Sequence, residues 1–232
     1  VISIIAILAA MLLPALSAAK RKAQVERAKQ QMAQIISAIQ GYEAEYNRFP
    51  SSSDAVTDAT SRRTDVTFGG YIKNPTTPNL VGTRTNSEVM AIIMDLEQFG
   101  NGQDTVNKGH VRNPKRTAYL NASRVSDDTS PGVGTDGVYR DPWGNPYVIT
   151  MDLNNDDRAA DAVYKLRVVS QSPNGAKTGF NGLLNPDASP NSDNFCLNAT
   201  VMVWSAGPDA IIHPGVKGDT GANKDNILSW KQ

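Results

Sequence analysis

The chain has 232 residues, and its 23 Lys and Arg residues balance its 23 Asp and Glu residues, so its formal net charge is zero. This length suits one domain with an appendage, and the balanced charge gives no indication of a surface for nucleic acid or for anionic lipid headgroups. Cys196 is the single cysteine of the sequence, which excludes an internal disulfide and a cysteine-based metal site.

The sequence begins with an apolar run at residues 1–19, in which only Ser3, Pro14 and Ser17 are not apolar. As a helix this run would be about 28 Å long, close to the hydrocarbon thickness of a bilayer. No basic segment precedes it, so it lacks the pattern of a cleaved signal peptide. We therefore expect it to lie in a bilayer or in the core of an assembly of identical chains.

Basic residues 20–22 follow the run, and beyond them the pattern becomes periodic. The positive-inside rule alone would place the rest of the chain in the cytoplasm. Apolar residues then recur every three or four positions: Val25, Ala28, Met32, Ile35, Ile39, Tyr42, Tyr46 and Phe49. This spacing predicts an amphipathic helix that packs on a sheet and ends before Pro50, with a coiled-coil dimer as the alternative.

If that helix continues from residue 1, it is about 70 Å long, so its first half must protrude from a domain of this size. Pro14 lacks a backbone N–H and clashes with the carbonyl of Ala10, which predicts a kink or local unwinding there. We therefore divide the chain into an apolar stem (1–22), an amphipathic half (23–50) and a head (51–232).

The head is rich in loops. We expect one short helix at residues 87–99, with Ser87 as its N-cap and Gly100 as its stop signal. Strands are expected at residues 117–120, 138–139, 147–151, 163–170 and 199–204. Together these elements predict an α+β fold in which the long helix covers a small antiparallel sheet with large loop insertions.

Each candidate catalytic or metal-binding motif lacks the neighbouring residues that its function requires, so we expect a protein that is not an enzyme. The glycines at 132–137 fit GxGxxG but lead into a strand and a proline rather than a helix. Residues 152–157 imitate a calcium loop, yet Asp157 and Val163 stand where that loop needs Gly and Glu. His110 and His213 lie far apart in polar loops, and neither has a Ser, Cys or carboxylate at a spacing that would indicate a hydrolase triad.

Four phrases together resemble type IV pilins and the major pseudopilin of type II secretion. They are the apolar run with its proline, YNRFP (46–50), DPWGNPY (141–147), and WSAGPD (204–209) with KDNILSW (224–230). The similarity covers the helix and the last ninety residues, whereas residues 51–135 read as an insertion. The processing site, methylated first residue and early glutamate of that family would lie before Val1.

The resemblance implies a pilin-like fold and a role as the structural subunit of a bacterial extracellular filament. It implies that the stem anchors the free subunit in the inner membrane and later packs in the fibre core, with partners that are identical subunits and the pilus or secretion machinery. The apolar residues expected to pack in the assembly are Ile4, Ile5, Leu8, Leu12, Pro14 and Leu16. The alternatives are a major pseudopilin of a periplasmic pseudopilus and a single-span membrane protein with a periplasmic binding or enzymatic domain.

A calcium site is expected in the last part of the head. Residues 205–230 hold several oxygen-bearing side chains between Gly and Pro, which is the ligand chemistry that Ca²⁺ prefers. The resemblance implies that Asp209, Asp225 and Asn226 are the ligands, with backbone carbonyls near Ala206 as further ones.

Overall fold

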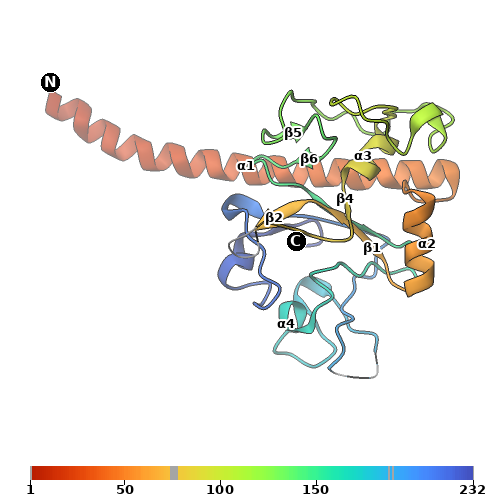
Figure 1. Ribbon diagram of the computed structural model, residues 1–232. Coiled ribbons are helices and arrows are strands. Elements are labelled where there is room, and N and C mark those ends of the chain that lie inside the picture. The colour runs from red at the N-terminus through yellow and green to blue at the C-terminus, as the bar shows by residue number, and fades with distance from the viewer. Residues whose placement is uncertain (1, 74–77, 188, 190, 232) are drawn as a thin grey trace.

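The computed structural model describes the backbone of residues 2–73, 78–187, 189 and 191–231, and the side chains of these residues except 2–11, 73 and 78–80. It shows an α+β fold in which one long helix, α1 (Ile2–Tyr46), extends from a head of short strands and loops (Figure 1). The first part of α1 projects beyond the head, and its second part lies along it (Figure 1).

The periodic half of α1 forms the interface with the head, as the spacing predicted. Met32, Ile35, Ile39 and Tyr42 are at most 1% exposed and belong to the main hydrophobic core. That core lies between α1 and the sheet, with β8 and β9 in contact with the helix. Burial of this face fixes α1 on the head, because each large apolar side chain removed from water contributes about 1.5–3 kcal/mol.

The expected unwinding at Pro14 does not occur. Helix α1 runs through Pro14 as one continuous element, and Figure 1 shows a gentle curve along the projecting part. The Ser17 hydroxyl donates a hydrogen bond to the Pro14 carbonyl oxygen at 2.8 Å. A proline removes one backbone hydrogen bond, which a helix of 45 residues tolerates without ending.

The main sheet is mixed rather than antiparallel. Its order is β4-β1-β7-β8-β9, formed by Arg84–Thr85, Val66–Gly69, Val148–Met151, Val201–Ser205 and Ile227–Leu228. The pair β1–β4 is parallel, whereas the other neighbours are antiparallel. The β2–β3 hairpin (Tyr71–Lys73 and Pro78–Leu80) reverses the chain once, and the bends at residues 81–83 reverse it again, so that β4 runs parallel to β1. Segment 51–135 therefore supplies β1 inside the sheet and is not confined to its periphery.

The remaining elements are short and lie around this sheet. They are α2 (Ser53–Arg62), α3 (Ser87–Ile93), α4 (Arg167–Ser170), the small pair β5 (Gly132–Val133) and β6 (Tyr139–Arg140), and the 3₁₀ turns η1 (Lys108–His110), η2 (Phe180–Gly182), η3 (Gly207–Asp209) and η4 (Gly221–Asp225). The sheet face opposite α1 is also covered, by a second cluster that includes Trp204, Tyr164 and Phe195. Burial on both faces explains the continuous apolar run of β8.

The predicted helix at 87–99 ends early and has a different cap. The structure ends α3 at Ile93, and Asn86 rather than Ser87 is its N-cap residue. The Asn86 side chain instead joins the backbone of Tyr139 and Tyr147: Nδ2 donates to the two carbonyls at 3.0 and 2.7 Å, and Oδ1 accepts from the Tyr139 N–H at 2.9 Å. This fully buried amide therefore connects α3 to β6 and to the residue that precedes β7.

Two predicted strands are wrong because side chains fold their backbone into turns. At 163–170 the carboxylate of Asp161 accepts from the N–H groups of Val163 and Tyr164 at 2.9 and 3.0 Å, and α4 follows. At 117–120 the Asn113 amide donates to the Thr117 carbonyl at 2.7 Å, and no strand forms. Such local bonds offer the backbone an alternative to a sheet.

Candidate functional site

The stem of α1 leaves large apolar side chains uncovered. Leu12, Leu13 and Leu16 are 65%, 66% and 67% exposed, and Pro14 is also exposed. The other predicted assembly residues, Ile4, Ile5 and Leu8, lie outside the residues whose side chains the structure describes. Within the described part of the stem, therefore, the chain itself provides no cover for an apolar surface that water disfavours.

In the part of the chain searched, no helix has both the length and the apolar character that crossing a membrane requires. The side chains of residues 1–11, more than half of the apolar run, lie outside the described set.

The base of the head holds the three predicted calcium ligands. Asp209 ends η3, Asp225 ends η4, and Asn226 follows. The two turns are in close contact at Gly207, which has a φ of +68°, and a Cβ on this residue would lie 2.3 Å from the Asp225 carbonyl oxygen. Glycine is thus needed at 207 for both its conformation and its lack of a side chain.

The charged residues near the contact of η3 and η4 shift the pKa of Asp225. Burial raises the pKa of its carboxyl, and the negative charge of Asp209 raises that pKa further. Arg21, on α1, opposes both effects, with its guanidinium 4.0 Å from the Asp225 carboxylate. The two carboxylates are therefore close enough to repel each other, a repulsion that a bound cation would relieve.

Asn226 contributes a buried oxygen with no partner. Its Nδ2 donates to the Tyr164 hydroxyl at 3.0 Å, while its Oδ1 is buried and accepts no hydrogen bond. Among the residues searched, no group of three or more His, Cys, Asp or Glu side chains is placed to hold a metal ion. The calcium site stays a prediction that rests on two carboxylates and one amide oxygen.

The phrases DPWGNPY and WSAGPD contact each other next to Gly207. The buried Asp141 carboxylate accepts from the N–H groups of Trp143 and Asn145, both at 2.9 Å, and from the Ser205 hydroxyl. Asn145 Nδ2 in turn donates to the Gly207 carbonyl at 2.8 Å. The segment between β6 and β7 thus forms a turn fixed by these hydrogen bonds, and it holds Ser205 and Gly207 in place at the start of η3.

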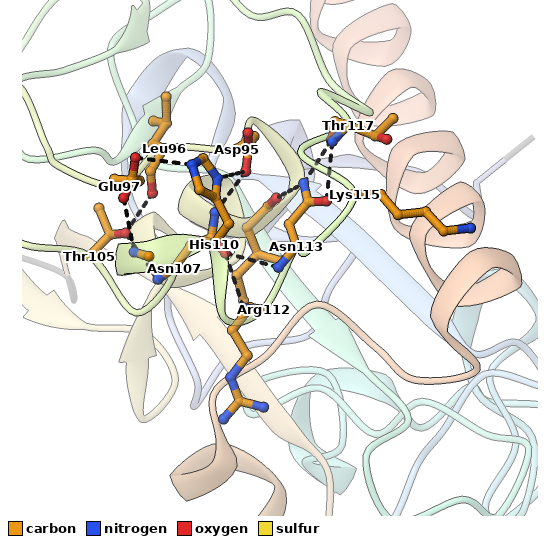
Figure 2. A network of polar contacts seen from close by, with 12 residues as sticks. Asp95, Leu96, Glu97, Thr105, Asn107, His110, Arg112, Asn113, Lys115 and Thr117 are labelled. Carbon is orange, nitrogen blue, oxygen red and sulfur yellow. Dashed lines mark hydrogen bonds and ion pairs between the residues drawn. The ribbon is translucent and has the colours of Figure 1, made fainter.

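A second polar cluster, which the sequence did not reveal, lies in the loops after α3 (Figure 2). His110 is placed between two carboxylates, with Nδ1 2.8 Å from Asp95 Oδ1 and Nε2 3.0 Å from Glu97 Oε1. Asn107 Nδ2 also donates to Asp95 at 3.0 Å, and the Gly109 N–H donates to Glu97 at 2.9 Å. These bonds hold together a segment that has no regular secondary structure apart from η1.

The same cluster is attached to the end of α1. The Tyr46 hydroxyl donates to Asn113 Oδ1 at 2.9 Å, and the Tyr42 hydroxyl donates to the Arg112 carbonyl at 2.5 Å. Asn113 is fully buried and also donates to the Ile92 carbonyl at 3.1 Å. Each contact drawn in Figure 2 joins parts of the head to one another, which is the pattern of a structural network.

Asp65 gives the head a dependence of stability on pH. Its Oδ2 accepts from the Ala160 N–H at 2.7 Å, and its Oδ1 is buried without a partner. Burial raises the pKa of this carboxyl from 3.8 to about 7, and the nearby Asp152 and Asp156 add to the rise. The folded chain therefore binds this proton more tightly than the unfolded chain, and its free energy of unfolding falls as pH rises from about 4 to about 7.

We expect Asp65→Asn to remove this decline. An amide has no proton to lose, so the variant will be more stable than the wild type at pH 8 by on the order of 2 kcal/mol and similar to it at pH 4. Urea unfolding at the two pH values measures the difference, with Asp219→Asn, an exposed carboxylate that is not among the charges acting on Asp65, as the control that changes little. An equal decline in the wild type and Asp65→Asn would contradict the role of this carboxyl.

In comparisons with protein-family models, curated proteins and solved structures, nothing matches this chain.

Proposed function

We propose that the chain is the structural subunit of a bacterial type IV pilin-like filament. The observation that carries the proposal is the stem: a helix attached to the head by a buried apolar face continues outward with exposed Leu12, Leu13 and Leu16. A neighbouring copy that buried one of these leucines would contribute about 2 kcal/mol for each. The free subunit would hold the same stem in the inner membrane before assembly.

The arrangement suits a fibre of identical subunits. Helix α1 packs on the head along its second half, whereas its residues 12–20 are exposed and can lie against the stems of other copies. Contacts of this kind join one face of a subunit to a different face of the next and produce an open helical polymer. The loops of the head would then form the outer surface, where insertions are well tolerated.

Electron microscopy of material sheared from the cell surface tests this proposal. We expect fibres a few nanometres wide that contain this chain. If the chain occurs only as a monomer in detergent-solubilised membranes, the filament proposal is wrong and a single-span membrane protein replaces it.

A major pseudopilin is the second candidate. Contact between the DPWGNPY and WSAGPD phrases, through Asp141 and Ser205 and through Asn145 and Gly207, favours it because these phrases resemble that family. Fibres confined to the periplasm would support this candidate over a surface filament.

We further propose that calcium binds at Asp209, Asp225 and the Oδ1 atom of Asn226. The repulsion between the two carboxylates and the unpartnered amide oxygen support this site. Calcium at one hundred times its dissociation constant stabilises a folded protein by about 2.7 kcal/mol, which corresponds to a rise of roughly 5–10 °C in Tm for a chain of this size.

Thermal unfolding with and without calcium measures that rise. Asp225→Ala should abolish it, whereas Asp219→Ala, an exposed carboxylate in the same loop, should leave it intact. The absence of any calcium effect on the wild type would rule out the site.

A further inference from the structure

A cavity of about 300 Å³ lies at the base of the head, between α1 and the C-terminal segment. We call it the base pocket. Its lining comes from residues 21–29 of α1, from Pro208, and from residues 224–231. Arg21 and Val25 directly follow the exposed residues 12–20 of α1, so the pocket lies where the stem meets the head.

The base pocket is strongly basic although the whole chain is neutral. Among its lining residues Asp225 is the one acidic residue. Four lining side chains are cationic: Arg21, Lys29, Lys224 and Lys231. Arg21 lies 4.0 Å from Asp225, which is too far for a hydrogen bond. Lys29 pairs with Glu26 at 3.2 Å, but neither Lys224 nor Lys231 forms an ion pair with any residue that the structure describes. Positive charge thus remains available at the pocket.

The rest of the lining is apolar, with one hydrogen-bond acceptor. Val25, Ile227 and Leu228 supply an apolar wall. Asn226 also lines the pocket; it is 7% exposed, and its buried Oδ1 has no donor. A ligand that suits this lining carries an anion for the basic side chains, a hydroxyl for Asn226 and an apolar part for the wall.

The position of the pocket indicates the source of such a ligand. Residues 20–22 directly follow the apolar run, so when the stem lies in a bilayer they are at the level of the lipid headgroups. Lys and Arg side chains near a bilayer surface attract anionic lipids by about 1 kcal/mol each, and basic pockets beside membrane helices bind phosphate-bearing headgroups. This holds whichever side of the membrane the head occupies.

We propose that the base pocket of the membrane-anchored subunit binds the headgroup of an anionic glycerophospholipid with a hydroxylated headgroup, of which phosphatidylglycerol is the simplest example. The basic side chains hold the phosphate, Asn226 accepts from a headgroup hydroxyl, and the start of the acyl chains lies along Val25 and Leu228. The inference rests on the anchored stage of the proposed function.

Lipid titration of the full chain in zwitterionic detergent micelles tests the proposal, with EDTA present so that calcium cannot bridge carboxylate and phosphate. The titrants are short-chain phosphatidylglycerol, short-chain phosphatidylcholine and inorganic phosphate. Tm and tryptophan fluorescence are measured, because Trp230 packs on Tyr164, the hydrogen-bond partner of Asn226. We expect saturable binding of phosphatidylglycerol, none of phosphatidylcholine, and at least tenfold weaker binding of inorganic phosphate.

Matched variants locate the binding. Lys224→Gln with Lys231→Gln should weaken phosphatidylglycerol binding at least tenfold, and Arg21→Gln should weaken it as a second, independent variant. Lys177→Gln with Lys217→Gln removes the same charge from exposed positions elsewhere on the head and should leave the affinity unchanged. Equal Tm values without lipid show that the variants remain folded.

The results that would overturn the lipid site differ from those that would overturn the filament. Equal binding of phosphatidylcholine, or equal loss in the control variant, would overturn a specific headgroup site, and equal binding of inorganic phosphate would overturn the lipid as its ligand. Fibres without any phosphatidylglycerol response would refute this inference alone. A saturable response in a chain that forms no fibres would refute the filament alone.

Discussion

A chain that carries Leu12→Arg and Leu16→Arg is expected to fold its head normally and to form no fibres. Both leucines are about two-thirds exposed in the single chain, so the replacements do not disturb the core of the head. They lie one turn apart on the same side of α1, and in a fibre each would place a charge in an apolar core, where an unpaired charge costs several kcal/mol.

Electron microscopy measures the abundance of fibres, and thermal unfolding shows whether the head is folded. Leu12→Met with Leu16→Met preserves the apolar surface and serves as the control, which should assemble. Membrane fractionation shows whether the arginine variant still reaches the membrane. Fibres of the arginine variant at wild-type abundance would show that the stem does not form the fibre core.

The second large effect is expected at the buried face of α1. Ile39→Asp places a carboxylate at a position that is fully buried against the sheet, and we expect it to lower the free energy of unfolding by about 4 kcal/mol or more. Gln40→Asp, at the adjacent exposed position, should change it by less than about 0.5 kcal/mol.

Urea unfolding of the two variants measures this contrast. The stem and the head are joined through this face of α1, so loss of the fold in Ile39→Asp should also release the stem. Equal stability of the two variants would mean that α1 does not pack on the head as the structure places it.

The sequence predicted the elements whose apolar pattern is regular. The spacing from Val25 to Phe49 identified the buried face of α1, and the apolar runs near 147–151 and 199–204 marked the positions of β7 and β8. In these segments the local pattern and the tertiary packing agree. Where they agree, a single sequence is sufficient to place the element.

The elements that were missed depend on hydrogen bonds from single side chains to the backbone, some of them local and some between distant parts of the chain. Asn86 donates to the carbonyls of Tyr139 and Tyr147, more than fifty residues later in the chain, which accounts for the misassigned N-cap of α3. Asp161 turns a segment that is rich in strand-forming residues into a turn and a short helix. Neither effect has a signature in the spacing of apolar residues.

The candidate sites also depend on contacts that the spacing of residues in the sequence does not reveal. Composition pointed to the C-terminal loop, and the structure brings Asp209 near Asp225. The basic side chains of the base pocket are about two hundred positions apart in the sequence, and the neutral net charge conceals them. Only the packing of the C-terminal segment on α1 brings them together.

Cryo-electron microscopy of assembled fibres measures the arrangement of the subunits most directly. We predict that helix α1 of each subunit lies near the fibre axis, with Leu12, Leu13 and Leu16 against the stems of neighbouring copies and the loops of the head outside. A fibre with heads at its centre and stems exposed, or purified full-length chain that stays monomeric under all conditions of assembly, would contradict the proposal.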